Sequence, residues 1–516
     1  MPDKLIIIGA GVSGLSVGCY LQMNGFRTEI FEMHNLPGGV CTAWSRGGYT
    51  FDGCIHWLMG SRPGVNLHQM WRELHAVQGK TFVEWDEYVR VRISTGEIFT
   101  VYSDPVRLRR EMLRLAPGDG KLIDILCGAI EKFSRIDMPV TTEKMGVLEK
   151  VRTYLPYLAA GPVLARLSSL NVQGFCSRLK SRALAEALGM LAGSEDSMPD
   201  FPVIGLAMML GFMHRKSNGY PIGGSKEFAR SIETRYRELG GIVHYGARVE
   251  KILVENDTAV GILCGDGEHR AAEVISCADG HATIFDMLGG RYISPLQREA
   301  YGSYQTYPSL IYVGVGLARD MSGVATNQLF PLKEPLRLEG GSLHLEKMGV
   351  RFFNFDPTTA PAGKTAAIVT IESRNLPYWQ ELRESDPARY REEKRRTGEM
   401  VVDALERELG GIRDAVEVID VATPATWHRY TGNWQGSYEG FLPTQKTLMK
   451  NLGFTLPGLA NFWMHGQWVS PGGGLPPAGM NGRALAKLLC RRYGRRFSAS
   501  EQVPACAQAR PGNGAC

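Results

Sequence analysis

A glycine-rich turn near the start of the chain is the first group of residues that could do chemistry. The apolar β-type run Leu5–Ile8 leads directly into Gly9–Gly14, which reads GAGVSG, and a helical pattern follows. In such a turn Gly9 permits the tight bend, Gly11 lets the backbone approach a pyrophosphate, and Gly14 lets the helix pack closely on the strand. The helix N-terminus then offers unpaired N–H groups to phosphates. We therefore expect a dinucleotide site here.

An acidic residue ends the next β-type run. Glu32 closes the run that begins at Thr28, and a carboxylate at this place can accept the ribose hydroxyls of an adenosine. A lone glycine motif would be weak evidence in a chain with 61 glycines. The order strand, glycine turn, helix, strand and acid is much more specific, and the acid disfavours a cofactor with a 2′-phosphate.

Further glycine turns favour FAD over NAD. Pairs at Gly38–Gly39 and Gly47–Gly48 precede Asp52–Gly53, and a cofactor whose flavin reaches across the domain needs such a second close approach of the backbone. Near the other end, an apolar strand leads through Gly466 into the turn Pro471–Gly474 and a new helix. That helix N-terminus could aim backbone donors and a positive dipole at the flavin pyrimidine.

These motifs resemble the FAD-dependent phytoene desaturase, carotenoid isomerase and retinol saturase family, within the amine-oxidase-like flavoproteins. The block YPIGGS at 220–225 and the strand pattern IVHYGARVEKI after Gly241 resemble the family's second FAD segment, and the pattern from Asp104 to Leu126 resembles the start of its substrate domain. The resemblance implies an FAD contact by the backbone around Val249. The cofactor-binding residues expected from the motifs and the resemblance are Gly9, Gly11, Val12, Ser13, Gly14, Glu32, Gly38, Gly39, Val40, Asp52, Gly53, Val249, Gly466, Pro471, Gly472, Gly473 and Gly474.

The expected fold class is α/β, with a Rossmann-like FAD-binding domain in three discontinuous segments and an interleaved α+β substrate domain. The first insertion is largely helical in pattern, and the second opens with alternating residues that predict strands. The tail after 498 is rich in Ala, Pro, Gly and Gln and is predicted to be disordered. The predicted FAD domain is 1–75, 217–300 and 445–495, and the substrate domain is 76–216 and 301–444.

His56 is the one candidate catalytic residue. It lies in the segment that, by the resemblance, passes along the flavin ring, where it could donate a proton or position a substrate; a structural histidine is the alternative. His465 could lie beside the flavin or be turned away from it. Two departures from the family pattern stand out: Val40 where many members have Arg, and Gln467–Val469 where desaturases usually have small or polar residues. The second departure weakens the narrower interpretation as a phytoene desaturase.

Composition excludes several classes of protein. The 516 residues carry a net charge of only +5, and the basic residues form no long tract interleaved with aromatics, which argues against nucleic acid as a partner. The ten cysteines include no C-x-x-C pair and no cluster at zinc spacing, so we expect reduced thiols, no metal and no disulfide-reductase chemistry. The N-terminus lacks a secretory signal pattern, which predicts a cytoplasmic protein.

The sequence therefore predicts an FAD-dependent oxidoreductase that acts on carbon–carbon double bonds of a polyene or isoprenoid lipid, by desaturation, saturation or cis/trans isomerisation. The cofactor is expected to be noncovalent, and the electron partner stays open between a quinone, oxygen and free nicotinamide. The alternatives are an amine or amino-acid oxidase and a non-catalytic prenyl-lipid carrier like the GDP-dissociation inhibitors, all on the same fold. A peripheral membrane contact is predicted from an apolar stripe edged by cations, comprising Tyr154, Leu155, Tyr157, Leu158, Val163, Leu164 and Leu167 with the following run Val203–Met213.

Overall fold

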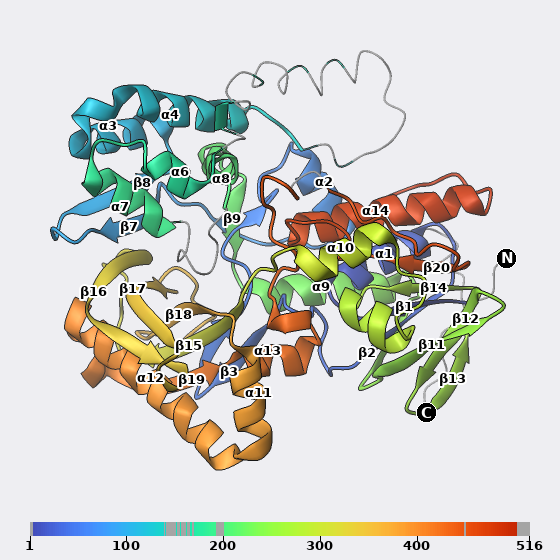
Figure 1. Cartoon of the computed structure of the whole chain (residues 1–516). Helices are drawn as coiled ribbons and strands as arrows, with labels where there is room; N and C mark the ends of the chain where they lie inside the picture. Colours follow the sequence, from blue (N-terminus) through green and yellow to red (C-terminus); the bar gives the residue numbers. More distant parts are fainter. Residues whose placement is uncertain are drawn as a thin grey trace.

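The computed structural model describes residues 4–138, 170–191, 201–447 and 450–502, with single positions 140, 151, 155, 161, 166 and 167 between them. Figure 1 shows the arrangement of the described parts: a Rossmann-like unit on the right, a group of helices at the upper left and a second sheet at the lower left. The site described below lies where these three parts meet.

A five-stranded parallel sheet forms the centre of the Rossmann-like unit, in the order β10-β2-β1-β14-β20. Its strands come from three stretches of chain that are far apart in sequence, each within one of the three predicted FAD segments. The residue boundaries of the domains stay a prediction. The strands are β1 (Leu5–Ile8), β2 (Thr28–Glu32), β10 (Ile242–Tyr245), β14 (Glu273–Ser276) and β20 (Phe462–Met464).

The alternation of β1 assigns its side chains to two different cores. Leu5 and Ile7 pack with helices α1 (Val12–Met23), α9 (Gly224–Glu238) and α14 (Leu475–Arg492). Ile6 and Ile8 pack on the opposite face, where the antiparallel strands β11–β13 cover the sheet. All four isoleucine and leucine side chains are buried, as expected for a parallel strand between two layers. The covering strands are β11 (Val249–Glu255), β12 (Thr258–Cys264) and β13 (Gly267–Arg270).

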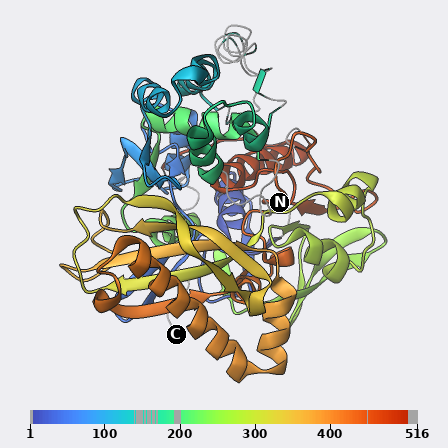
Figure 2. The ribbon, with the colours of Figure 1, turned by 60° about the vertical axis from the view of Figure 1, so that its left-hand side comes forward.

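A seven-stranded mixed sheet, ordered β19-β15-β18-β17-β16-β7-β8, joins the two insertions. The parallel pairing of β16 with β7 makes the connection between them. Figure 2 shows helices α11 (Leu376–Ser385) and α12 (Pro387–Leu409) over the outer face of this sheet. The other face lines the cavity. The strands are β7 (Glu87–Arg92), β8 (Ile98–Tyr102), β15 (Ser309–Leu317), β16 (Asn327–Leu338), β17 (Leu343–Phe352), β18 (Thr365–Ser373) and β19 (Val416–Ala422). The predicted combination of a Rossmann-like unit with an interleaved α+β unit is confirmed.

The helices at the upper left of Figure 1 share one apolar core. The apolar run predicted to contact a membrane is α8 (Val203–His214), and most of its side chains are buried. It packs on α4, so the structure gives α8 a role in the core. Within the described ranges, no helix has the length and apolar character needed to span a bilayer. The other helices of this group are α3 (Pro105–Leu115), α4 (Gly120–Ser134), α6 (Val172–Cys176) and α7 (Arg182–Leu191).

The first residues of the tail predicted from 498 contact the Rossmann-like unit. The backbone of Ser498 exchanges hydrogen bonds with the Asn24 side chain, and the Glu501 carboxylate pairs with Arg72 at 2.7 Å. Residues 503–516 lie outside the described residues, and the disorder of the tail stays a prediction. The remaining elements connect the units: β3 (Ala43–Arg46), β4 (Tyr49–Asp52), β5 (Leu58–Met59), α2 (Asn66–Glu73), β6 (Phe82–Val83), β9 (Asn218–Pro221), α10 (Pro295–Ser303) and α13 (Pro424–Thr431).

Candidate active site

A cavity of about 2750 Å³ runs between the Rossmann-like unit, the mixed sheet and the helices. Its walls include the glycine turn after β1, the cavity face of β17 and the side chains of α8. Single small-molecule sites usually measure roughly 300–1,000 Å³. This cavity therefore has room for a large cofactor together with a long second ligand.

Three glycines of the first turn have different surroundings. Gly9 has a φ of +97°, in the left-handed region, and its N–H donates to the carbonyl of Phe31 at 2.8 Å. A Cβ at Gly14 would lie 1.9 Å from the Gly9 carbonyl oxygen, so Gly14 serves the packing of strand on helix. A Cβ at Gly11 would meet only the Gly38 oxygen, at 3.8 Å. The space next to the Gly11 Cα, at the N-terminus of α1, is therefore open to the cavity.

Glu32 lies where β2 ends and lines the same cavity. Its carboxylate accepts the N–H of Ala10 at 2.6 Å and the N–H of His34 at 2.8 Å. Burial raises the pKa of this carboxyl and the backbone donors oppose that rise. Two backbone bonds leave further lone pairs on the two oxygens, so the side chain is held in place and can still accept ribose hydroxyls. Val249 lines the cavity nearby.

The C-terminal glycine turn meets the N-terminal one across the cavity. A Cβ at Gly466 would lie 3.4 Å from the Ser13 hydroxyl oxygen, although more than 450 positions separate the two residues. Gly472, Gly473 and Gly474 all have positive φ and lead into α14. Glycine backbone from an N-terminal and a C-terminal segment therefore faces the same cavity. This glycine cradle fits an extended dinucleotide.

The structure brings most of the predicted cofactor-binding residues to this cavity and leaves three away from its lining. Gly14 is enclosed by its own turn, Pro471 does not reach the lining, and Asp52 has a different role. The predicted residues that line the cavity are Gly9, Gly11, Val12, Ser13, Glu32, Gly38, Gly39, Val40, Gly53, His56, Val249, Gly466, Gly472, Gly473 and Gly474.

The Asp52 carboxylate connects several buried segments of the protein through hydrogen bonds. Its buried carboxylate accepts the Ser225 N–H at 2.8 Å, the Ser225 hydroxyl, the Tyr220 hydroxyl at 2.9 Å and the Cys54 N–H at 3.0 Å. Ser225 lies in the first turn of α9, so Asp52 joins β4 to a helix N-terminus. Tyr312 donates to the Asp52 backbone carbonyl. The side chain is therefore occupied by protein donors, and the expected direct contact with a cofactor has no support from its position.

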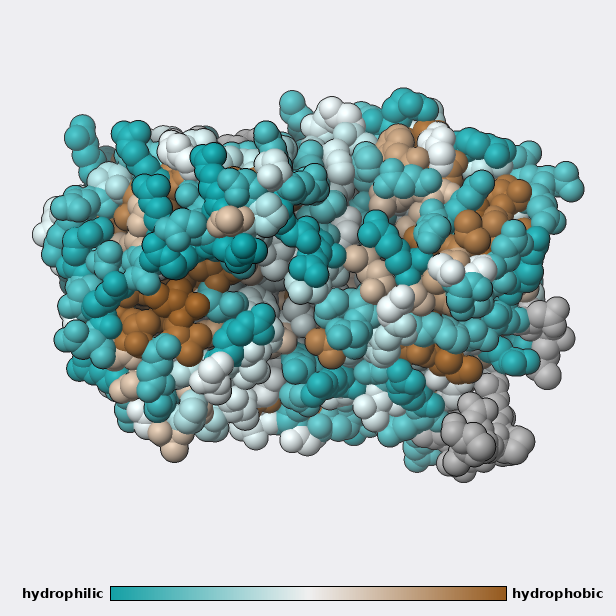
Figure 3. All heavy atoms as spheres, turned by 90° about the horizontal axis from the view of Figure 1, so that it is seen from below, coloured by the Kyte–Doolittle hydropathy of each residue, from teal (hydrophilic) through white to brown (hydrophobic). Residues whose placement is uncertain are grey.

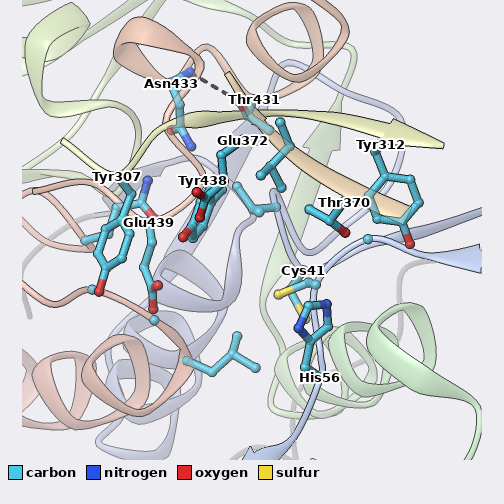
Figure 4. A pocket seen from close by; sticks show the side chains of 18 of the residues that line it. Cys41, His56, Tyr307, Tyr312, Thr370, Glu372, Thr431, Asn433, Tyr438 and Glu439 are labelled. Atoms are coloured by element: carbon cyan, nitrogen blue, oxygen red, sulfur yellow. Dashed lines mark hydrogen bonds between the residues drawn. The ribbon is translucent and has the colours of Figure 1, made fainter. Parts of the chain in front are cut away.

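His56 projects into the cavity, as Figure 4 shows, with its side chain accessible from the interior. The surrounding protein disfavours a charged imidazole and the Arg351 guanidinium repels it, which together lower the pKa of His56 to about 3. A neutral His56 can accept or donate a hydrogen bond but is not an acid at neutral pH. His465 is buried, with Nε2 3.2 Å from the Ala478 carbonyl oxygen, so it is turned toward α14.

Sequence reasoning missed two charged side chains that line the cavity. Glu439 stands beside Tyr307 and Tyr438 in Figure 4, and its backbone oxygen would lie 2.2 Å from a Cβ at Gly473. Burial raises the pKa of the Glu439 carboxyl to about 8. Arg351 is the second. Both residues lie outside any motif, and only the tertiary arrangement brings them to the glycine turns.

Comparisons with known proteins identify the Rossmann-like segment and relatives that span most of the chain. Residues 7–74 match the NAD(P)-binding Rossmann-like domain. The chain is 23% identical to prolycopene isomerase of Daucus carota, with 95% of this chain and 80% of the relative covered. It is 25% identical to 4,4′-diapophytoene desaturase of a Methylomonas species, with 96% of each covered.

Solved structures show the same fold. An oxidoreductase of Methanosarcina mazei superposes with a TM-score of 0.59 at 19% identity, covering 94% of this chain and all of that one. A putrescine oxidase variant gives 0.58 at 13% identity, covering 95% and 99%. The fold and the glycine turns define a Rossmann-type dinucleotide-binding protein. The resemblance to carotenoid desaturases and isomerases, inferred from the motifs, is confirmed over nearly the whole chain.

Proposed function

We propose that this protein is an FAD-dependent oxidoreductase that acts on carbon–carbon double bonds of a polyene or isoprenoid lipid. The observation that carries the proposal is the single cavity that begins at Gly11 and Glu32 and extends to apolar side chains of α8 and β17, such as Met208 and Leu345. A dinucleotide and a long apolar chain fit end to end in such a space. Relatives that span the chain are named as polyene isomerases and desaturases.

The residues fit FAD in the following way. The N–H groups at the start of α1, beside Gly11, would hold the pyrophosphate, and Glu32 would hold the ribose. Backbone around Val249 would contact the adenine, and the Gly472–Gly474 turn with the N-terminus of α14 would contact the flavin. When bound, FAD supplies a site that accepts or donates hydride. We propose noncovalent binding, which predicts that acid precipitation of the protein releases all flavin into the supernatant.

The chain's own groups would orient the polyene, exclude water and hold a proton. The cavity face of the mixed sheet and α8 supplies apolar walls, and Met208 and Met209 can adapt to a flexible chain. The Glu439 carboxyl is largely protonated at pH 7, since burial raises its pKa to about 8. It lies beside the glycine turn proposed to contact the flavin, so it is placed to donate or receive a proton at a polyene carbon.

Substrate would enter from a membrane surface, because each CH₂ transferred from water to lipid is favoured by about 0.8 kcal/mol. Of the predicted apolar stripe, Leu155 is exposed and Leu167 is buried; Tyr154, Tyr157, Leu158, Val163 and Leu164 lie outside the described residues. The face seen in Figure 3 carries apolar patches separated by hydrophilic side chains. Flotation with anionic liposomes at low and high salt tests this step, and a protein that stays soluble in both contradicts it.

The decisive experiment compares lipids extracted from cells with and without the gene by mass spectrometry. A change of two hydrogens in a polyene identifies desaturation or saturation, and an unchanged mass with a shifted retention time identifies isomerisation. Purified protein supplied with that lipid and with a quinone, oxygen or nicotinamide then identifies the electron partner. Turnover of amines or amino acids instead of polyenes would favour the oxidase alternative, and a colourless protein that binds prenyl lipids would favour the carrier.

A further inference from the structure

Arg351 is a buried cation in an otherwise largely apolar part of the cavity. It lies near the inner end of β17, whose alternation sends Met348, Val350 and Phe352 into the core of the mixed sheet. The Arg351 side chain lies on the opposite face of β17, which lines the cavity. Only 8% of the surface of Arg351 is exposed. The strand therefore presents this guanidinium to whatever occupies the cavity.

Protein groups satisfy only part of the guanidinium. Its Nη2 donates to the His56 carbonyl oxygen at 3.1 Å, while its buried Nε has no hydrogen-bond partner in the described part of the chain. Arginine carries five N–H donors in a rigid fork. Four aromatic rings surround the group, those of Trp85, Tyr220, Phe353 and Phe355, with centroids 5.2–5.4 Å from its Cζ. The rings fix the plane of the fork and provide no acceptor.

No carboxylate within the described ranges lies within ion-pair distance of Arg351. The Asp52 carboxylate opposes the lowering of the pKa of Arg351, and protein donors already occupy that carboxylate. Burial lowers the pKa of Arg351 and the hydroxyls of Tyr88, Tyr220 and Tyr312 oppose this change. A buried charge without a counterion is costly. A ligand that carries a negative charge would supply the missing counterion.

We propose that Arg351 binds a carboxylate at one end of the polyene or isoprenoid substrate. This inference rests on the proposed function and names the class of substrate: a long apolar chain with an acidic end group. The Nη groups, which keep N–H donors beyond the bond to His56, would donate to the carboxylate oxygens. Because Arg351 donates to the backbone of His56, an anchored end group would also fix which double bond lies beside the His56 segment.

The probes are trans-parinaric acid, a fluorescent polyene with a carboxylate, and its methyl ester, titrated into the flavin-loaded protein at pH 7. The wild type is expected to bind the acid at least tenfold more tightly than the ester. Arg351→Met is expected to remove this difference while ester affinity stays within twofold, and Arg351→Lys is expected to keep part of it. Arg383→Met is the matched control, because Arg383 also lines the cavity but is only half-buried. It should leave the tenfold ratio unchanged.

Three results would overturn the inference and leave the proposed function standing. The first is a wild type that binds the ester as well as the acid, a result that requires no variant to fold. The second is an equal loss of acid preference in Arg383→Met, which would show a diffuse effect of charge. The third is loss of flavin from Arg351→Met with the acid preference intact, which would assign the guanidinium to the cofactor. If the wild type binds neither probe, the polyene site itself is refuted and the proposed function fails with the inference.

Discussion

Gly11 and Gly14 offer a matched test of the dinucleotide site, because the same added methyl group should act in opposite ways at the two positions. At Gly14 a Cβ would lie 1.9 Å from the Gly9 oxygen, closer than real Cβ contacts allow. At Gly11 the backbone has φ −64° and ψ 171°, which any residue adopts, and the nearest protein atom is 3.8 Å away. Gly14→Ala therefore strains the protein, and Gly11→Ala or Gly11→Val fills only the cavity.

The expected magnitudes follow from these distances. Overpacking at Gly14 should lower the free energy of unfolding by about 3 kcal/mol or more, since the obstacle is backbone. In the cofactor-free protein, Gly11→Val should cost less than about 1 kcal/mol, as at other helix N-caps. If the side chain removes two charge-assisted hydrogen bonds to a pyrophosphate, each worth about 1.5–3 kcal/mol, the affinity for FAD should fall by roughly 10²–10⁴-fold.

Thermal melts of the cofactor-free proteins and fluorescence titration with FAD measure the two effects separately. Gly11→Val should melt close to the wild type and bind FAD weakly, whereas Gly14→Ala should melt well below it. Wild-type FAD affinity in Gly11→Val would refute the location of the pyrophosphate. Equal destabilisation by both substitutions would show that the effect at Gly11 is merely structural.

Three further predictions concern single side chains. Glu439→Gln should flatten the pH dependence of Tm. Because the folded-state pKa of Glu439 is raised to about 8, its stabilising contribution is fully present below the unfolded-state pKa near 4.5 and is lost as pH rises through about 8. A Tm profile parallel to that of the wild type would contradict this. Asp52→Ala should lower the free energy of unfolding by more than about 3 kcal/mol, because four donors lose their acceptor; an unchanged urea midpoint would remove Asp52 from its structural role. His56→Ala should lower kcat more than flavin content, and equal losses would assign it to the cofactor.

Local sequence predicted the parts of the site that depend on backbone geometry. The roles of Gly9 and Gly11 follow from steric rules within a few residues, and Glu32 follows from the end of a parallel strand. Sequence also predicted that the turn from Gly466 to Gly474 contacts the flavin, from the strand, the turn and the helix N-terminus, whereas the contact of Gly466 with Ser13 is visible only in the structure. The glycine turns around it predict a cofactor contact for Asp52, whereas its carboxylate accepts from Cys54 and from Tyr220 and Ser225, some 170 positions later.

Arg351 and Glu439 could not be predicted because long-range packing determines their environment. On an isolated β17, Arg351 would be one more solvated cation, and the rings of Trp85 and Tyr220 from distant segments complete its enclosure beside Phe353 and Phe355. The environment of Glu439 depends on the close approach of Gly473 and Gly474, which follow it by more than 30 positions. A single sequence carries no signal for such burial. The alternation of β17 indicates which face a residue occupies, and the fold decides what that face contacts.

The interleaving of the two units also constrains when the protein can fold. The edge strand β20 ends at Met464, and α14, which packs on α1, follows it. A ribosome adding about 5–20 residues per second needs roughly 20–90 s between completing β1 and completing β20. During that time the Rossmann sheet has an open edge, and α1 lacks α14 although α9 is synthesised earlier. We therefore expect folding to be largely post-translational and yield to depend on chaperones that protect this edge, more than in proteins whose domains follow one another along the chain.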